Sequence, residues 1–377
     1  MRRRRRDRSR PSRRLRVALV SFDFGNVCVP LANGLAKEAD VLLLLADDDF
    51  HTRWSEIDDQ VLARPIRKAR LRQPFRQIRM CRDVMRTIRE FDPDVVHVQQ
   101  GHLWFNFALP LVRRRYPIVV TIHDPRPHLG DTPSRRTPQF AMDIAFNTAD
   151  RLIVHAEALR REVAREFGRT VDEVDVIPHV APNVPVYAGS QTAPEPVVLF
   201  FGRIWPYKGL QYLLEAEPLI SAVIPDVHVI VAGEGEDLQR YMDLVAEPGR
   251  VEFRNEYIPH REVPALFREA AVVVAPYVDA TQSGVIPFAY AQGRPVVATY
   301  VGALPEMVDD GVDGLLVPPR DSRALADAIV RILESEALWC TMSQAARRRA
   351  ETEWSPAAIA KQTLASYEAL LDQVCLS

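Results

Sequence analysis

The stretch LFFGRIWPYKGLQYLLEA, Leu199 to Ala216, decides the fold of this 377-residue chain. An apolar run typical of a buried strand ends at Gly202, a short loop carries Arg203, and Lys208 and Gly209 open an amphipathic helix. Two cations and the N–H groups of a helix start favour the binding of one anion such as phosphate. Two surface cations on an ordinary loop are the alternative.

The same alternation of strand and helix extends over most of the chain. The first half holds the apolar runs RVALVSF, DVLLLLA, DVVHVQ, PIVVTI, RLIVHA and VDVIP, and the second half holds PVVLFF, DVHVIVA, RVEFR, AVVVAP, RPVVAT and DGLLVP. The pattern predicts an α/β protein with two doubly wound domains facing a cleft. We expect a basic disordered arm over 1–15, domains over 16–185 and 196–355, and a proline-rich linker between them.

Composition excludes several classes of protein. With 47% hydrophobic and 26% charged residues the chain is globular, and it holds no apolar run long enough to span a bilayer, so we expect a cytoplasmic protein. The four cysteines show no metal-ligand spacing, which predicts neither a disulfide nor zinc. The GxGxxG, GxxxxGK[ST] and GxSxG motifs are absent, which weakens the dehydrogenase, P-loop and serine hydrolase interpretations.

A second polar loop follows the strand that ends at Pro276. Small and polar residues over Asp279 to Val285 lead into the next helix, and they offer hydroxyls, an amide and helix-start N–H donors to a diphosphate. The candidate ligands here are Asp279, Thr281, Gln282, Ser283, Gly284 and Val285. Ordinary capping of the helix by Ser or Thr explains the loop equally well.

The chain resembles the retaining, nucleotide-sugar-dependent glycosyltransferases of family four, which have the GT-B fold. The resemblance covers about residues 16–370 and rests on FFGRIWPYKGL, VIVAGEGED, GRPVVATYVGALPEMVDDGVDGLLVPPRD and ETEWS, in that order. It implies that Arg203 and Lys208 neutralise the donor diphosphate, that Ser283 and Gly284 hold it, and that the last helix, 356–375, packs back on the first domain. It also implies donor contacts from Gly202, Gly233, Tyr257 and Ile258.

One departure from the family concerns two glutamates, eight positions apart, that usually contact the donor. Counting back from Gly293 places them at Ala280 and Phe288, where neither residue is glutamate. Asp279 or Gln282 is a candidate substitute for the first. The departure leaves a catalytically silent, sugar-nucleotide-binding subunit as the alternative to an active enzyme.

In the first domain the segment VVTIHDPRPHLGD places His123 just after a strand. The resemblance implies a catalytic histidine there that contacts the donor sugar, whereas a structural histidine is the alternative. His128 is a candidate acceptor contact. The loop FDFGNV supplies Gly25 and Asn26, where relatives bring a glycine-rich turn near the diphosphate.

Positive charge gathers near the N-terminus. Residues 1–16 and 64–89 each carry a charge of +9, while the whole chain carries −2. On a helix from Arg72 to Phe91 one face is arginine-rich, and it favours an anionic lipid surface or a polyanionic acceptor over nucleic acid, for which no recognition fold is present. This face comprises Arg72, Phe75, Arg76, Arg79, Arg82 and Arg86. An ordinary solvated helix face is the alternative.

Together these patterns predict a metal-independent, retaining glycosyltransferase without a bound cofactor. It would move a sugar from a nucleotide donor to a hydroxyl of a lipid-linked glycan or another membrane-proximal acceptor, as a peripheral protein on the inner face of the cell membrane. A soluble small-molecule acceptor is the alternative.

Overall fold

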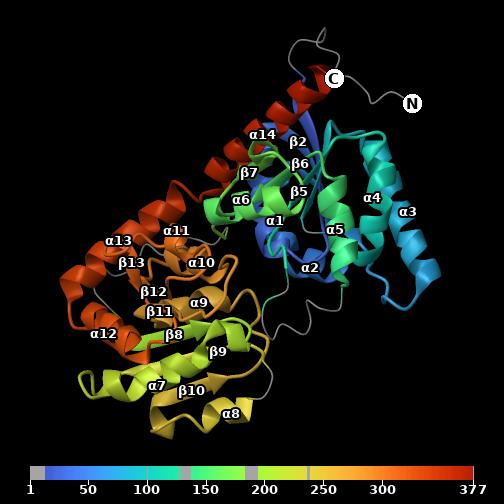
Figure 1. Cartoon of the computed structure of the whole chain (residues 1–377). Coiled ribbons are helices and arrows are strands. Elements are labelled where there is room, and N and C mark those ends of the chain that lie inside the picture. Colours follow the sequence, from blue (N-terminus) through green and yellow to red (C-terminus); the bar gives the residue numbers. More distant parts are fainter. Residues whose placement is uncertain are drawn as a thin grey trace. The chain divides into compact units, whose positions relative to one another are not determined.

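The computed structural model describes residues 13–99, 101–126, 128, 137–182, 194–235 and 238–376. The chain divides into two compact units (Figure 1). The first unit comprises Met1–Arg126, Thr132–Asn183 and Ser355–Ser377, and the second comprises Pro127–Asp131 and Val184–Trp354. Each unit contains one parallel sheet, as the alternating apolar runs predict.

The sheet of the first unit has seven strands in the order β3-β2-β1-β4-β5-β6-β7. Its strands are β1 (Leu15–Ser21), β2 (Ala39–Ala46), β3 (Val61–Ile66), β4 (Val95–Gln99), β5 (Ile118–Thr121), β6 (Arg151–Val154) and β7 (Val174–Val176). The connecting helices are α1 (Gly25–Ala36), α2 (Asp47–Thr52), α3 (Pro74–Phe91), α4 (Leu103–Arg113), α5 (Gln139–Thr148) and α6 (Glu157–Glu166). The strand order reverses direction between β1 and β4, which is where open α/β sheets bind ligands.

The sheet of the second unit has six strands in the order β10-β9-β8-β11-β12-β13. Its strands are β8 (Val197–Phe201), β9 (His228–Ala232), β10 (Val251–Arg254), β11 (Val272–Ala275), β12 (Val296–Thr299) and β13 (Gly314–Val317). The helices are α7 (Leu210–Ser221), α8 (Leu238–Met242), α9 (Val263–Glu269), α10 (Val285–Ala291), α11 (Leu304–Met307), α12 (Ser322–Leu333) and α13 (Glu336–Glu351). Here the strand order reverses between β8 and β11.

Burial explains why the strands are so uniformly apolar. The central strands of both sheets are covered on both faces, and residues such as Val17, Val95, Val198 and Val273 are fully buried. The cores of the two units consist mainly of Val, Leu, Ile and Ala side chains. The twelve apolar runs found in the sequence correspond to twelve strands of the two sheets.

The last helix, α14 (Pro356–Leu376), belongs to the first unit and packs against α1 (Figure 1). The approach is close at Gly34, where a Cβ would lie 2.2 Å from the carbonyl oxygen of Pro356. The Ser366 hydroxyl donates a hydrogen bond of 2.5 Å to Asp175, whose carboxylate also accepts one from Arg151. These contacts tie the end of the chain to β6 and β7.

Two details differ from what the sequence predicted, and parts of two predicted segments lie outside the described residues. The edge strand β3 is an addition, and it contains Pro65, which an edge strand tolerates because it lacks a partner on one side. Strand β1 begins at Leu15, inside the predicted arm, and residues 1–12 of that arm lie outside the described part of the chain. The predicted linker falls largely on residues 183–193, which also lie outside the described part of the chain.

No described helix is long and apolar enough to cross a membrane.

Candidate active site

Two glycines bring the loops after β8 and β9 together. Gly202 and Gly233 have positive φ angles of 111° and 134°, and a Cβ on Gly233 would lie 2.2 Å from the carbonyl oxygen of Gly202. The Ile204 N–H donates a hydrogen bond of 2.8 Å to the carbonyl of Glu234. Arg203 is therefore held on a fixed turn, and its side chain is exposed.

Lys208 lies at the end of a short 3₁₀ helix, η4 (Pro206–Lys208), directly before α7. Gly209 takes the left-handed conformation, and a Cβ there would lie 1.9 Å from the carbonyl oxygen of Pro276, so this loop packs directly on the end of β11. The ammonium group of Lys208 donates a hydrogen bond of 2.7 Å to the hydroxyl of Tyr277 and lies 3.9 Å from the centre of that ring. The two predicted loops are thus joined by a buried lysine.

The hydroxyl of Tyr277 also contacts the hydroxyl of Ser283, which is buried as well. Their hydroxyl oxygens are 3.1 Å apart, and Ser283 also accepts a hydrogen bond of 3.2 Å from the Val285 N–H. The ammonium group of Lys208 can only donate, so the Tyr277 oxygen is its acceptor, and either hydroxyl can be the donor in the contact between Tyr277 and Ser283. Burial raises the pKa of Tyr277 to about 12, opposed by the charge of Arg203, so Tyr277 stays a phenol at neutral pH.

His128 joins the same group of residues and belongs to the second unit, although the sequence analysis assigned it to the first domain. Its ring stacks on Tyr207 with 4.7 Å between ring centres, and its nitrogens lie 3.1 Å from the Asp279 carboxylate and 2.8 Å from the Thr281 hydroxyl. Tyr207 and Tyr277 were not among the predicted site residues. The sequence offered one indication of them, because each of these tyrosines lies in or beside one of the two polar loops.

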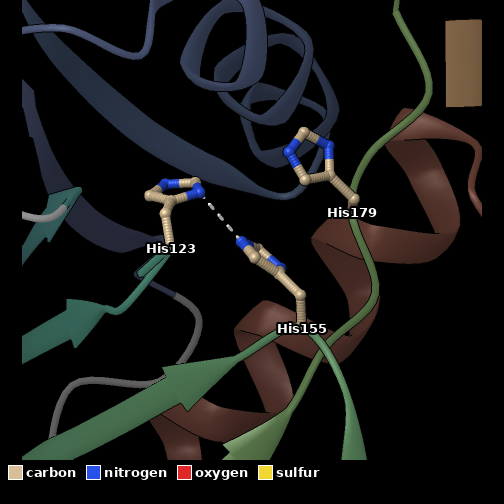
Figure 2. A group of neighbouring side chains, drawn as sticks. All are labelled: His123, His155 and His179. Atoms are coloured by element: carbon tan, nitrogen blue, oxygen red, sulfur yellow. Dashed lines mark hydrogen bonds between the residues drawn. The ribbon is translucent and has the colours of Figure 1, made fainter. Parts of the chain in front are cut away.

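In the first unit His123 follows β5 and is fully buried. Its Nε2 lies 2.8 Å from Oε1 of Gln99, its Nδ1 lies 3.2 Å from Nε2 of His155, and its ring stacks on Phe24. His179 completes a group of three histidines (Figure 2). Burial holds the pKa of His123 well below its usual value, so the ring is neutral.

The other predicted donor residues lie at strand ends. Gly25 and Asn26 begin α1 after β1, and the Gly25 N–H donates a hydrogen bond of 3.2 Å to Asp49. Tyr257 and Ile258 follow β10, and the Tyr257 side chain is 67% exposed. Their donor contacts, like the cleft between the domains, stay predictions.

Comparison with known proteins identifies the family. The family model described as Glycosyltransferase Family 4 matches residues 25–180, and the one described as Glycosyl transferases group 1 matches residues 195–335. The D-inositol 3-phosphate glycosyltransferase of Saccharomonospora viridis is 30% identical in an alignment of 301 residues, and the match covers 71% of this chain and 69% of that protein. The chain belongs to glycosyltransferase family 4.

Solved structures agree on the fold. The HepE protein of Anabaena in complex with UDP and glucose is similar to 94% of this chain and 100% of its own, with a TM-score of 0.72 and 19% identity. Sucrose-phosphate synthase from Thermosynechococcus elongatus is similar over 96% of this chain and 100% of its own, with a TM-score of 0.72 and 22% identity. The two parallel-sheet domains of this glycosyltransferase are therefore those of the GT-B fold.

The structure shows what replaces the two glutamates that the resemblance led us to expect in this glycosyltransferase. Phe288 is buried, with its ring 5.8 Å from that of Phe267 and 5.8 Å from that of His260. Ala280 is buried beneath Gly302, where a Cβ would lie 1.6 Å from the Ala280 carbonyl oxygen. Both positions are used for packing, and neither side chain offers a polar group to a ligand.

The arginine-rich helix of this glycosyltransferase is shorter than predicted. Helix α3 begins at Pro74, so Arg72 lies in the turn before it, because proline is favoured in the first helical turn. The expected apolar side is confirmed, with Met80, Val84 and Ile88 buried. Phe75 and the arginines are exposed, and within the described residues four arginines of this group have no ion-pair partner: Arg72, Arg76, Arg79 and Arg82.

Proposed function

We propose that this glycosyltransferase moves a sugar from a nucleoside diphosphate donor to an acceptor hydroxyl, with retention of configuration and without a metal ion. One observation carries the proposal. Lys208, Tyr277 and Ser283 form a connected group at the reversal point between β8 and β11, and the charge of Arg203 acts on the same tyrosine. This is the position at which an α/β sheet receives a nucleotide.

The chemistry of the departing group suits these residues. When a nucleoside diphosphate leaves a sugar, negative charge develops on its β-phosphate, and donors fixed in place before the reaction stabilise that charge best. Arg203 and Lys208 supply the cations, while Ser283 supplies a hydroxyl group. The leaving phosphate would accept the proton of the attacking hydroxyl on the same face, which gives retention without a carboxylate nucleophile.

The donor we propose is a UDP-sugar. The Anabaena neighbour was solved with UDP and glucose. In addition, two buried polar atoms in the candidate site have no hydrogen-bond partner within the described residues: Nε1 of Trp205 and Oε1 of Gln282. A bound donor would give these atoms partners, since buried polar groups are rarely left unsatisfied.

We propose that His123 contacts the donor sugar, which requires a change in its present hydrogen bonds. Both ring nitrogens already contact neighbours, Gln99 and His155, inside the first unit. Contact with a sugar hydroxyl therefore requires one nitrogen to exchange its partner when the donor binds.

Donor binding tests the proposal directly. Isothermal titration with UDP, GDP, UDP-glucose and GDP-mannose should show binding of UDP and its sugar, and Arg203→Ala should weaken UDP binding by at least tenfold, because a charge-assisted contact is worth about 1.5–3 kcal/mol. Arg323→Ala is the matched control, since that arginine is exposed on α12 and paired with Asp327. Equal UDP affinity in the two variants would contradict the diphosphate assignment.

We further propose that the acceptor lies at an anionic membrane surface. Helix α3 and its preceding turn carry the four arginines that have no ion-pair partner within the described part of the chain, and Phe75 among them is 86% exposed. The adjoining helices α4 and α5 expose Phe107 and Phe140. Cations with exposed aromatic side chains are typical of a protein that binds a lipid interface.

Sedimentation with vesicles separates this acceptor class from a soluble one. Vesicles with anionic lipid should sediment the protein at low salt while neutral vesicles leave it in solution, and a triple Arg76→Ala, Arg79→Ala, Arg82→Ala variant should lose most of this binding. Arg161→Ala, an exposed arginine on α6, serves as the control. Absence of binding to anionic vesicles would favour a soluble acceptor, as the name of the inositol phosphate relative suggests.

A further inference from the structure

Three histidines meet at one edge of the first unit's sheet. His123 follows β5, His155 follows β6 and His179 follows β7, and these strands are neighbours in the sheet. Because the strands are parallel, their carboxyl ends lie at the same edge, and the three rings point toward one another (Figure 2). One nitrogen of each ring lies within 4.8 Å of the others.

The contacts on the outer side of the rings decide where their protons are. Nδ1 of His155 lies 2.9 Å from the carbonyl oxygen of Ile177, and Nδ1 of His179 lies 3.4 Å from that of Val180. A carbonyl oxygen only accepts, so these nitrogens carry the N–H. A neutral imidazole has one N–H, and Nε2 of each ring is therefore a lone-pair donor.

His123 follows the same rule through Gln99. The amide nitrogen of Gln99 faces the Thr121 hydroxyl at 3.4 Å, so its oxygen faces Nε2 of His123 at 2.8 Å and accepts the proton there. Nδ1 of His123 then also presents a lone pair, 3.2 Å from the lone pair of His155. A proton or a metal ion between these two nitrogens would each account for so short a separation.

We propose that His123, His155 and His179 form a binding site for one divalent transition-metal ion, with zinc as the best fit. Three imidazoles with an open fourth position are a common zinc ligand set. Two nitrogens at about 2.0 Å from a tetrahedral zinc ion are about 3.3 Å apart, which the His123–His155 pair already matches. The outer carbonyl contacts are those that orient metal-binding histidines in other proteins.

The surroundings of the site suit a cation. The charge of Asp124 acts on both His155 and His179, so a bound ion would be partly compensated. The ion would join the ends of β5, β6 and β7, and so stabilise the first unit. This inference shares His123 with the proposed sugar transfer: with an ion on Nδ1, a donor sugar would have to take the place of Gln99 at Nε2. The tests below therefore measure ion binding and not transfer.

The test uses the full-length protein after treatment with a chelator that is then removed. Titration with Zn²⁺ should show one bound equivalent and a higher melting temperature, since a ligand that binds only the folded state stabilises it. Co²⁺ should give the intense visible absorption of a tetrahedral site, and this measurement needs no variant. A chain that binds neither ion at submillimolar concentration would overturn the proposal.

Variants assign the ion to the site. His179→Gln should weaken Zn²⁺ binding by about 100-fold or more, which is at least the loss seen when a supporting residue of a metal site is changed. His51→Gln is the matched control, because His51 is an exposed histidine of the first unit that pairs only with Asp47 among the described residues, and it should leave binding unchanged. Equal binding in both variants would place the ion elsewhere and refute the site.

Discussion

Replacement of Lys208 by methionine tests the proposed diphosphate site most sharply. Methionine keeps an unbranched apolar chain in the buried space beside Tyr277 but removes the charge. The ammonium group is held in place by the 2.7 Å hydrogen bond to Tyr277, so it needs no rearrangement when charge develops on the leaving phosphate. Loss of one such fixed donor raises a reaction barrier by about 2.7–4 kcal/mol, which is about 100- to 1,000-fold in kcat.

Tyr277→Phe gives a graded comparison. It leaves the lysine charge but removes the hydroxyl that positions it, and a hydrogen bond to a charged group is worth about 1.5–3 kcal/mol, or about 10- to 150-fold in rate. Because Tyr277 acts through Lys208, the double variant should be no slower than Lys208→Met alone, within about twofold.

The assay is hydrolysis of UDP-glucose, followed by release of UDP, so that it needs no identified acceptor. Melting temperatures of each variant show whether the fold survives. A folded Lys208→Met protein that turns over within threefold of the wild type would refute the reasoning, and so would a double variant whose losses simply multiply.

Three further predictions concern stability. Gly302→Ala should lower the free energy of unfolding by more than about 3 kcal/mol and weaken donor binding, because the new Cβ would displace Ala280. In Gly311→Ala the new Cβ meets no atom within 4 Å, so the loss should be only about 1–2 kcal/mol, caused by the positive φ. Equal losses of the two variants in urea denaturation would contradict this. Asp313→Ala should cost about 3–5 kcal/mol, because buried Asp313 pairs with Arg349 at 2.9 Å; a loss below 1 kcal/mol would be inconsistent with that pair. In the presence of chelator, the first unit should lose stability between pH 7.5 and 5.5, by about 1.4 kcal/mol for each histidine that stays neutral in the fold, because the unfolded chain takes up protons below pH 6.5 and the folded chain does not. Burial lowers the pKa of five histidines of this unit: His97 and His179 (to about 3), His102 (to about 4), His123 and His155. Denaturation at the two pH values measures the loss, and an unchanged free energy of unfolding would contradict the prediction.

The sequence predicted most of the fold because buried parallel strands leave a clear apolar pattern. Strand β3 was not predicted because apolar and polar residues alternate only weakly in its VLARPI segment, which also contains Pro65. Proline is permitted in a strand at the edge of a sheet. The start of α3 was misplaced by the two residues before Pro74, since arginine periodicity continues into the preceding turn.

The sequence predicted only part of the candidate site. Arg203, Lys208 and Ser283 lie in two segments whose residue types suit a phosphate, but the part of Tyr277 appears only when β8 and β11 lie side by side. The assignment of His128 to the second unit likewise depends on a loop whose contacts no local pattern encodes.

By itself, the amino-acid sequence determined that this protein has two parallel α/β domains and that cations follow the strand ending at Gly202, because strand burial and helix periodicity are local properties of the chain. Only the tertiary structure decided which side chains meet. His123, His155 and His179 are 32 and 24 positions apart, a spacing that resembles no metal motif. They come together because parallel strands place their carboxyl ends at one edge, and that register is set by the packing of the whole sheet.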